Sequence, residues 1–254
     1  MKAKLEKSIW KRNIIRIVLI AILVSIFAVT IISCRGIVLG SGNVISEDRD
    51  VSGFSKVSVS GSGNLYIEQG DEESLTIEAE DNILPFITTE VSGNTLKIGF
   101  KTGINITTNI TPTKNIEFYL RVKDLDSISA SGSGSINCSG LSTDNLSIKT
   151  SGSRKVDMSN LKATSIDINS SGSVNITLTG TTDNQNIKTS GASKYFAEEL
   201  KSKSCIIDAS GSSEIIVNVS DDLNVTISGS TKVTYVGSPT ITQKTSGSAA
   251  IKSK

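Results

Sequence analysis

Carboxylates are the side chains of this 254-residue chain best suited to acid–base chemistry, because the chain contains no histidine. The lack of histidine excludes Ser-His-Asp triads, Cys-His dyads and histidine-ligated metals. A hydrolase or lyase acting on polysaccharides would therefore need two or three clustered carboxylates beside an Arg or Lys. Asp157, Asp167 and Asp208 instead occupy different positions of a sequence repeat. Asp221 and Asp222 are neighbours, which point to opposite faces of a strand.

These patterns predict that the protein is not an enzyme. No EF-hand loop or calcium-binding nonapeptide repeat is present in the sequence, so no metal site is expected. No pattern indicates a cofactor either.

Cys34 is a different kind of candidate, because its sulfur could carry a lipid. Residues 1–16 hold six basic residues and one acidic residue, a net charge of +5, and an apolar stretch follows from Ile17. A basic start followed by an apolar run is typical of an export signal or a membrane anchor. The segment Ile31-Ile32-Ser33-Cys34 resembles a relaxed bacterial lipobox, in which the cysteine receives a diacylglycerol. Cys34 is therefore the candidate lipid-attachment residue.

The alternative is an uncleaved helix from Ile14 to Ile32, with Cys34 as an unmodified thiol beside the membrane. Such a helix of about 19 residues nearly spans a hydrocarbon core of about 30 Å. Both alternatives leave the basic end in the cytoplasm and the rest of the chain outside. We expect a bacterial envelope protein, anchored to membrane lipid as a lipoprotein or by a single N-terminal transmembrane helix.

A recurring Ser-Gly dipeptide organises the residues after position 40. From Ser131 onward the dipeptide returns at steps of about 18 to 20 residues, which is typical of one coil of a solenoid. Apolar or small residues stand three and one positions before each Ser and five and seven positions after it. Alternation of this kind predicts a strand on each side of a corner. The serines of the dipeptide are Ser60, Ser131, Ser151, Ser171, Ser190, Ser210, Ser228 and Ser246.

Each repeat is accordingly predicted to be a strand, a Ser-Gly corner, a second strand and a short return. Coils that stack about 4.8 Å apart place equivalent residues above one another and enclose a narrow core. Small and β-branched residues suit such a core, and aromatic residues make up only 4% of the chain. Glycine at each corner allows a positive φ, so Gly172→Val is expected to destabilise the protein.

Two further expectations follow from this coil. Cys138 and Cys205 fall in inward positions of coils about three or four layers apart, roughly 14 Å or more. A disulfide needs Cα atoms within about 7 Å, so both cysteines should be buried free thiols. Thr150, Thr189 and Thr245 should also face inward. The outward positions mix Lys, Asn, Asp and Glu, and they form either a solvated face or a stripe that binds a glycan or polymer.

Residues 40–130 are less regular than the coils that follow. Their wider spacing predicts longer strands or hairpins. Acidic residues between residues 68 and 81 are expected on an exposed edge: Glu68, Asp71, Glu72, Glu73, Glu78, Glu80 and Asp81.

Several strings in this section occur in a fixed order and carry a family resemblance. They are GSGNV (40–44), RDVSGF (49–54), VSVSGSGNLYIEQGDEESL (57–75), EAEDNILP (78–85), TPTK (111–114) and ISASGSG (128–134). These strings closely resemble the putative auto-transporter adhesin, head GIN domain family. The resemblance implies a secreted or lipid-anchored bacterial protein with a right-handed β-helix-like fold, and it supplies no catalytic residues.

Together these observations predict an all-β chain with a right-handed parallel β-helix behind a membrane-anchor or signal segment. We expect a leader at 1–34, a linker at 35–39 and a solenoid domain at 40–254, with regular coils at 131–254. The expected function is an exported binding module, an adhesin of unknown ligand. Its partner would be an extracellular glycan or protein. Because the charge outside the leader is −4, nucleic acid is not expected.

Two other functions stay open. The protein could be a structural scaffold that self-assembles into homo-oligomers, because an uncapped end of a β-helix offers a pairing edge. A polysaccharide-active enzyme is the third and weakest alternative.

Overall fold

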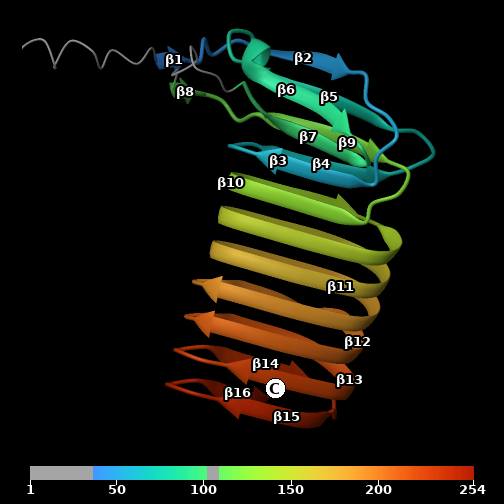
Figure 1. Cartoon of the computed structure of the whole chain (residues 1–254), viewed down its shortest axis with the longest axis vertical. Coiled ribbons are helices and arrows are strands. Elements are labelled where there is room, and N and C mark those ends of the chain that lie inside the picture. Colours follow the sequence, from blue (N-terminus) through green and yellow to red (C-terminus); the bar gives the residue numbers. More distant parts are fainter. Residues whose placement is uncertain (1–36, 102–108) are drawn as a thin grey trace, which may run out of the picture. The chain divides into compact units, whose positions relative to one another are not determined.

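The computed structural model describes residues 37–101 and 109–254, so Cys34 and the apolar segment lie outside the described residues. Strands β1 (Ile37–Leu39) and β8 (Asn109–Thr111) pair with each other in a two-stranded sheet. The other strands form a continuous 14-stranded sheet that winds into stacked coils (Figure 1). Within the described part, no helix is long and apolar enough to cross a membrane.

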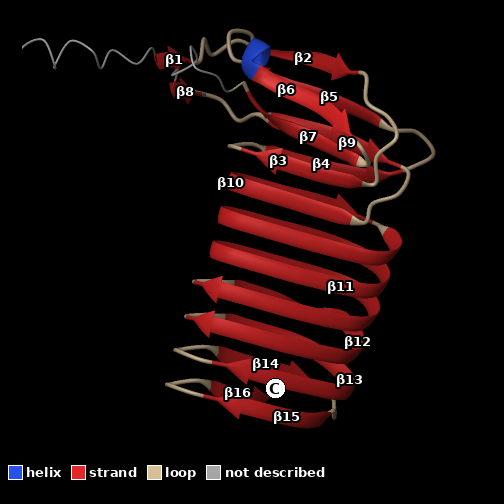
Figure 2. Ribbon diagram, in the orientation of Figure 1, coloured by secondary structure: helices blue, strands red, loops and turns tan. Residues whose placement is uncertain are grey.

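The coils begin at β10 and run to the C-terminal residues (Figure 2). All neighbouring strands here are parallel and stack in register, so that Ile128 lies opposite Ile148 and Gly132 opposite Gly152. The solenoid has about 6 turns, and the prediction of an all-β, right-handed parallel β-helix is confirmed. The strands are β10 (Ser127–Ser139), β11 (Ser142–Gly191), β12 (Lys194–Gly211), β13 (Glu214–Ile227), β14 (Lys232–Val236), β15 (Thr240–Thr245) and β16 (Ala250–Ser253).

The core consists of columns of side chains, in which the predicted inward positions of successive coils stack on one another. The position three residues before the corner serine is buried in seven of the eight repeats: Val57, Ile128, Ile148, Ile168, Ile187, Ile207 and Val225. Thr150 and Thr189 are buried as expected. Thr245 is exposed, which corrects the prediction for that residue. It lies in β15, near the end of the coil stack, where β13 is its one partner strand among the described residues.

The Ser-Gly corners require glycine for two separate reasons. Gly172 has a φ of +98°, in the left-handed region that residues with a Cβ rarely adopt. A Cβ at this position would also lie 2.4 Å from the carbonyl oxygen of Gly152 in the adjacent coil. Stacked coils therefore approach too closely at the corner for any side chain to fit.

The section from residue 40 to residue 125 combines coil strands with antiparallel ones. Strands β3 and β4 pair in parallel with β10 and continue the coil stack. Strands β6 and β7 form an antiparallel hairpin, and β5 pairs antiparallel with both β2 and β9. The predicted hairpins are therefore present. The elements are β2 (Val44–Arg49), β3 (Lys56–Ser60), β4 (Asn64–Gln69), β5 (Ser74–Glu80), the 3-10 helix η1 (Leu84–Phe86), β6 (Ile87–Ser92), β7 (Thr95–Phe100) and β9 (Glu117–Val122).

Glu80 does not belong to an exposed edge, which corrects another prediction. Glu80 is 1% exposed. Its carboxylate accepts hydrogen bonds from the backbone N–H groups of Gly42 (2.7 Å), Thr113 (2.8 Å) and Lys114 (3.3 Å). Burial by itself would raise the pKa of Glu80, but the hydrogen bonds from Thr113, Gly42 and Lys114 together lower it. The carboxylate thus joins three of the sequence strings that carry the family resemblance.

Arg154 connects the corner between β3 and β4 to the coils that follow. Its side chain is buried and donates hydrogen bonds to the carbonyl oxygens of Gly61 (2.9 Å), Gly63 (3.1 Å) and Ser131 (2.7 Å). Burial lowers the pKa of its guanidinium. Gly63 and Gly134, at the equivalent position of the two preceding coils, carry no side chain and leave room for the long Arg154 side chain.

Candidate ligand-binding surface

The cysteines lie where the coil pattern places them. Cys138 and Cys205 are both buried and free. Burial raises the pKa of the Cys138 thiol to about 11 and raises that of Cys205 further. Neither thiol can act as a nucleophile near neutral pH, because the reactive species is the thiolate.

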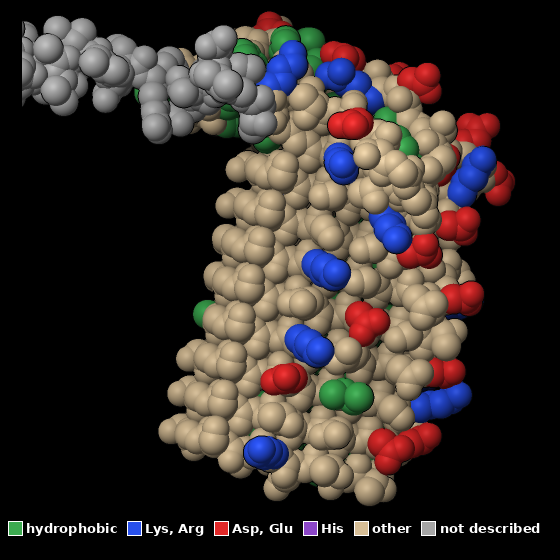
Figure 3. All heavy atoms as spheres, in the orientation of Figure 1, with side chains coloured by type: hydrophobic (Ala, Val, Ile, Leu, Met, Phe, Trp, Pro, Cys, Tyr) green, Lys and Arg blue, Asp and Glu red, His purple; other side chains and the backbone are tan. Residues whose placement is uncertain are grey.

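The aspartates of the predicted outward positions are not brought together. Asp157 pairs with Lys155 at 3.6 Å, and Asp167 accepts a hydrogen bond from Asn186 at 3.0 Å. Asp208 lies opposite Lys188 on the neighbouring coil. Within the described ranges no group of His, Cys, Asp and Glu could hold a metal ion. Figure 3 shows that basic and acidic side chains are scattered among uncharged ones on the visible face of the coils.

A polar groove runs across the returns of successive coils, on the side away from the Ser-Gly corners. Its volume is about 770 Å³, and most of the side chains that line it are exposed. The lining residues are Ser55, Asp124, Asp126, Ser142, Thr143, Asp144, Lys162, Ala163, Thr164, Thr181 and Asp183. Four carboxylates and one ammonium group therefore face one hollow, a cluster that the sequence did not reveal.

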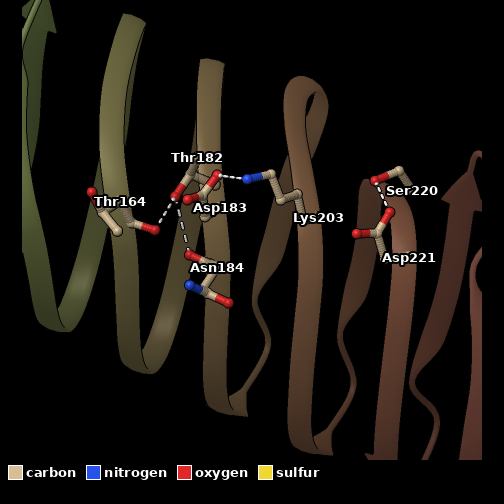
Figure 4. A network of polar contacts seen from close by, with 7 residues as sticks. All are labelled: Thr164, Thr182, Asp183, Asn184, Lys203, Ser220 and Asp221. Atoms are coloured by element: carbon tan, nitrogen blue, oxygen red, sulfur yellow. Dashed lines mark hydrogen bonds and ion pairs between the residues drawn. The ribbon is translucent and has the colours of Figure 1, made fainter.

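A network of polar contacts extends from this groove along the next coils (Figure 4). The Thr182 hydroxyl donates to the backbone carbonyl of Thr164 at 3.2 Å, which ties two coils together. Lys203 approaches Asp183 at 2.8 Å, and this hydrogen bond raises the pKa of the Lys203 ammonium group. Part of the acidic charge of the groove is neutralised by this pair.

The groove offers charged and polar groups that can bind a polar ligand. Asp124, Asp126 and Asp144 are exposed to water. Their carboxylates can accept hydrogen bonds from hydroxyl or ammonium groups of a ligand.

Comparison with protein families settles which family the fold represents. Residues 53–239 match the model described as "Putative auto-transporter adhesin, head GIN domain". The chain belongs to this family. Among curated proteins no match is found.

Solved structures of similar proteins share the GIN-domain fold. A putative adhesin from Bacteroides fragilis is 25% identical, with a TM-score of 0.78 over 85% of this chain and 100% of that one. A putative lipid binding protein from Parabacteroides distasonis is 22% identical, with a TM-score of 0.72 over 86% and 99% of the two chains. A putative adhesin from Parabacteroides merdae is 17% identical and has a TM-score of 0.61 over 86% and 99%.

The GIN family therefore supports an adhesin-like character and an extracellular or envelope location. The predicted family and fold are confirmed. The sequence did not find the groove, because its residues lie in returns whose length varies from coil to coil. A register shift between Thr177 and Gly180, directly before Thr181, shows this variation.

Proposed function

We propose that this protein is an exported, envelope-anchored binding module that holds an extracellular glycan or protein ligand on the outer surface of its β-helix. The main support for this proposal is that side chains fill the interior of the coils. The inward columns consist of side chains with almost no contact with water. Variation from coil to coil is concentrated outside, so ligand recognition belongs to the outer surface. Membership of an adhesin-like family supports the same function.

Anchoring through Cys34 lipid or an uncleaved N-terminal helix is part of this proposal. Mass spectrometry of the mature N-terminus distinguishes the two. A peptide that begins at a diacylglycerol-modified Cys34 identifies a lipoprotein. A peptide that begins at Met1 with unmodified Cys34 rules lipidation out.

Ligand binding is tested with the full-length chain in detergent micelles, applied to an array of oligosaccharides and extracellular matrix proteins. We expect saturable binding to at least one class of ligand. An array on which nothing binds at any protein concentration would contradict the proposed function.

A second candidate function is self-assembly, and the last strands favour it. Among residues 37–101 and 109–254, strands β15 and β16 are each paired on one side, with β13 and β14 respectively. Ile241 in β15 is 36% exposed. Unpaired strand edges attract other strands, although lysines such as Lys244 and Lys252 oppose this. Sedimentation velocity distinguishes these two functions. An increase in particle size with protein concentration supports a scaffold, and a monomer at every concentration supports the binding module.

A further inference from the structure

Two aromatic side chains, Tyr66 and Tyr119, lie on the otherwise mostly polar outer surface. Aromatic residues are rare in this chain, and Phe54, Phe118 and Tyr195 are buried. Tyr66 on β4 and Tyr119 on β9 are partners in register and lie outside the core. Their rings stack with centroids 5.2 Å apart and an interplanar angle of 15°. Tyr119 is 41% exposed, so part of this aromatic surface faces water.

A hollow of about 310 Å³ lies beside the stacked rings. Strand β5 pairs with β9 on the side away from β4, and it places Thr76 opposite Tyr119 and Ser74 opposite Arg121. Because Thr76 and Ser74 are small, the hollow beside the Tyr119 ring stays open. Its lining residues are Tyr66, Ile67, Glu68, Ser74, Thr76, Tyr119, Leu120 and Arg121.

Hydrogen-bonding groups of both kinds surround the rings. Arg121 Nε donates to Glu68 Oε2 at 3.1 Å, and the Tyr119 hydroxyl donates to Glu78 Oε2 at 3.5 Å. A hydrogen bond to Glu117 raises the pKa of Tyr66, and partial burial with the charge of Glu78 raises that of Tyr119. Both phenols therefore keep their protons at neutral pH and remain donors.

This combination selects among the possible ligand classes. Aromatic cages for ammonium groups surround the cation with ring faces. Here the two rings cover each other and present a single side, so they cannot surround a cation. An apolar peptide would cover the exposed Glu68–Arg121 pair without offering it any hydrogen bond. A pyranose ring offers an apolar C–H face for an aromatic ring and a rim of hydroxyls for carboxylate, guanidinium and hydroxyl groups.

We propose that the Tyr66–Tyr119 face is a carbohydrate-binding site, in which a neutral pyranose ring stacks on Tyr119 above Thr76. Its hydroxyls bond to Glu68 and Arg121 at the edge of the hollow. This inference rests on the proposed binding function and names the ligand class and the contact residues.

The test measures affinity of the full-length chain in micelles for immobilised neutral oligosaccharides of glucose, galactose, mannose and N-acetylglucosamine. A cationic peptide and a protein with a net charge near zero serve as comparison ligands. Tyr119→Ala removes the stacking ring, and Thr76→Gln fills the hollow without changing either ring. Phe196→Ala is the matched control: it removes an aromatic ring that lies between buried Tyr195 and Ala197 on β12, and whose register neighbours are Thr177 and Ile216. Thermal unfolding of every variant checks that the fold is retained.

We expect Tyr119→Ala and Thr76→Gln each to weaken oligosaccharide binding about tenfold or more, the scale of a lost aromatic contact at a binding site. Phe196→Ala should bind like the unchanged protein. Equal affinity of Tyr119→Ala, Thr76→Gln and the unchanged protein would overturn the site and leave the binding function standing. Binding confined to the peptide or the protein would overturn the ligand class. Binding to no ligand would overturn both this site and the proposed function.

Discussion

The regular coils from residue 127 onward and the antiparallel section from residue 40 to residue 125 share the Ser-Gly corner but are stabilised differently. In the coils each residue stacks on its equivalent one turn away, as Ile128 does on Ile148. In the antiparallel section, single side chains hold segments that no repeat would align, and Glu80 joins Gly42 to Thr113 in this way. Repetition thus builds the scaffold. The stacked tyrosines lie in the irregular section.

The largest expected effect comes from the corner that repetition requires. Gly172→Val introduces a Cβ at a φ of +98° and within 2.4 Å of the Gly152 carbonyl oxygen. Strain and the broken stack should lower the free energy of unfolding by about 3 kcal/mol or more. Urea unfolding followed by circular dichroism measures this change.

Gly140→Val separates the clash from the strain. Gly140 has a φ of +80°, but a Cβ at this residue would have no atom of the described residues beyond its chain neighbours within 4 Å. The same substitution there should therefore cost about 1 to 2 kcal/mol. Equal losses at the two positions would show that close stacking of the coils does not matter at the corner.

Arg154 tests the junction between the two regions. Arg154→Ala leaves the carbonyls of Gly61, Gly63 and Ser131 without this donor in a buried place. We expect a loss of about 2 to 3 kcal/mol in unfolding free energy. The neighbouring exposed substitution Lys155→Ala should change it by less than about 0.5 kcal/mol. Matching results for the two variants would mean that Arg154 does not stabilise the junction.

Glu80 gives the antiparallel section a dependence on acid. Because its pKa is lowered in the folded protein, its contribution to stability is complete above the unfolded pKa of about 4.3. The contribution disappears as the pH falls through the lower folded value. Glu80→Gln should therefore lower the melting temperature at pH 7, with a difference that shrinks below about pH 4.3.

The control for this comparison is Glu90→Gln, which changes an exposed carboxylate. It should leave the melting temperature nearly unchanged at every pH. A difference between Glu80→Gln and the unchanged protein that stays constant from pH 7 to pH 3 would contradict the role of the Glu80 charge.

The smallest effect concerns the thiols of the coil core. Since burial raises the pKa of Cys138 to about 11 and also raises that of Cys205, neither should react with a thiol reagent at pH 8 while the protein is folded. In a Cys34→Ser variant, mass spectrometry should detect no label before unfolding and two labels after it. Rapid labelling of the folded variant would show that the coil core opens readily.

The sequence predicted the coils well, because a period of identical corners reports stacking directly. Ile148, Gly152 and Val156 could be assigned to inward or corner positions from the repeat, and the structure agrees. Glu80 was misplaced on an exposed edge, because only the antiparallel pairing brings Gly42 and Thr113 around its carboxylate.

The binding surfaces were harder to predict for the same reason. Tyr66 could be read as outward from its neighbours Leu65 and Ile67, and Tyr119 from Phe118 and Leu120. Their stacking depends on a pairing of β4 with β9 across 53 residues, which the local alternation does not reveal. The groove residues lie in returns of variable length, outside the repeating columns.

The most direct test of the central claim, that the coils are a scaffold and the irregular section carries the ligand site, compares two variants on the oligosaccharide array. One is Tyr66→Ala with Tyr119→Ala, and the other removes groove charges through Asp144→Ala, Lys162→Ala and Asp183→Ala. We predict that the tyrosine variant loses binding while the groove variant binds like the unchanged protein. Loss of binding in the groove variant, with full binding in the tyrosine variant, would contradict the account.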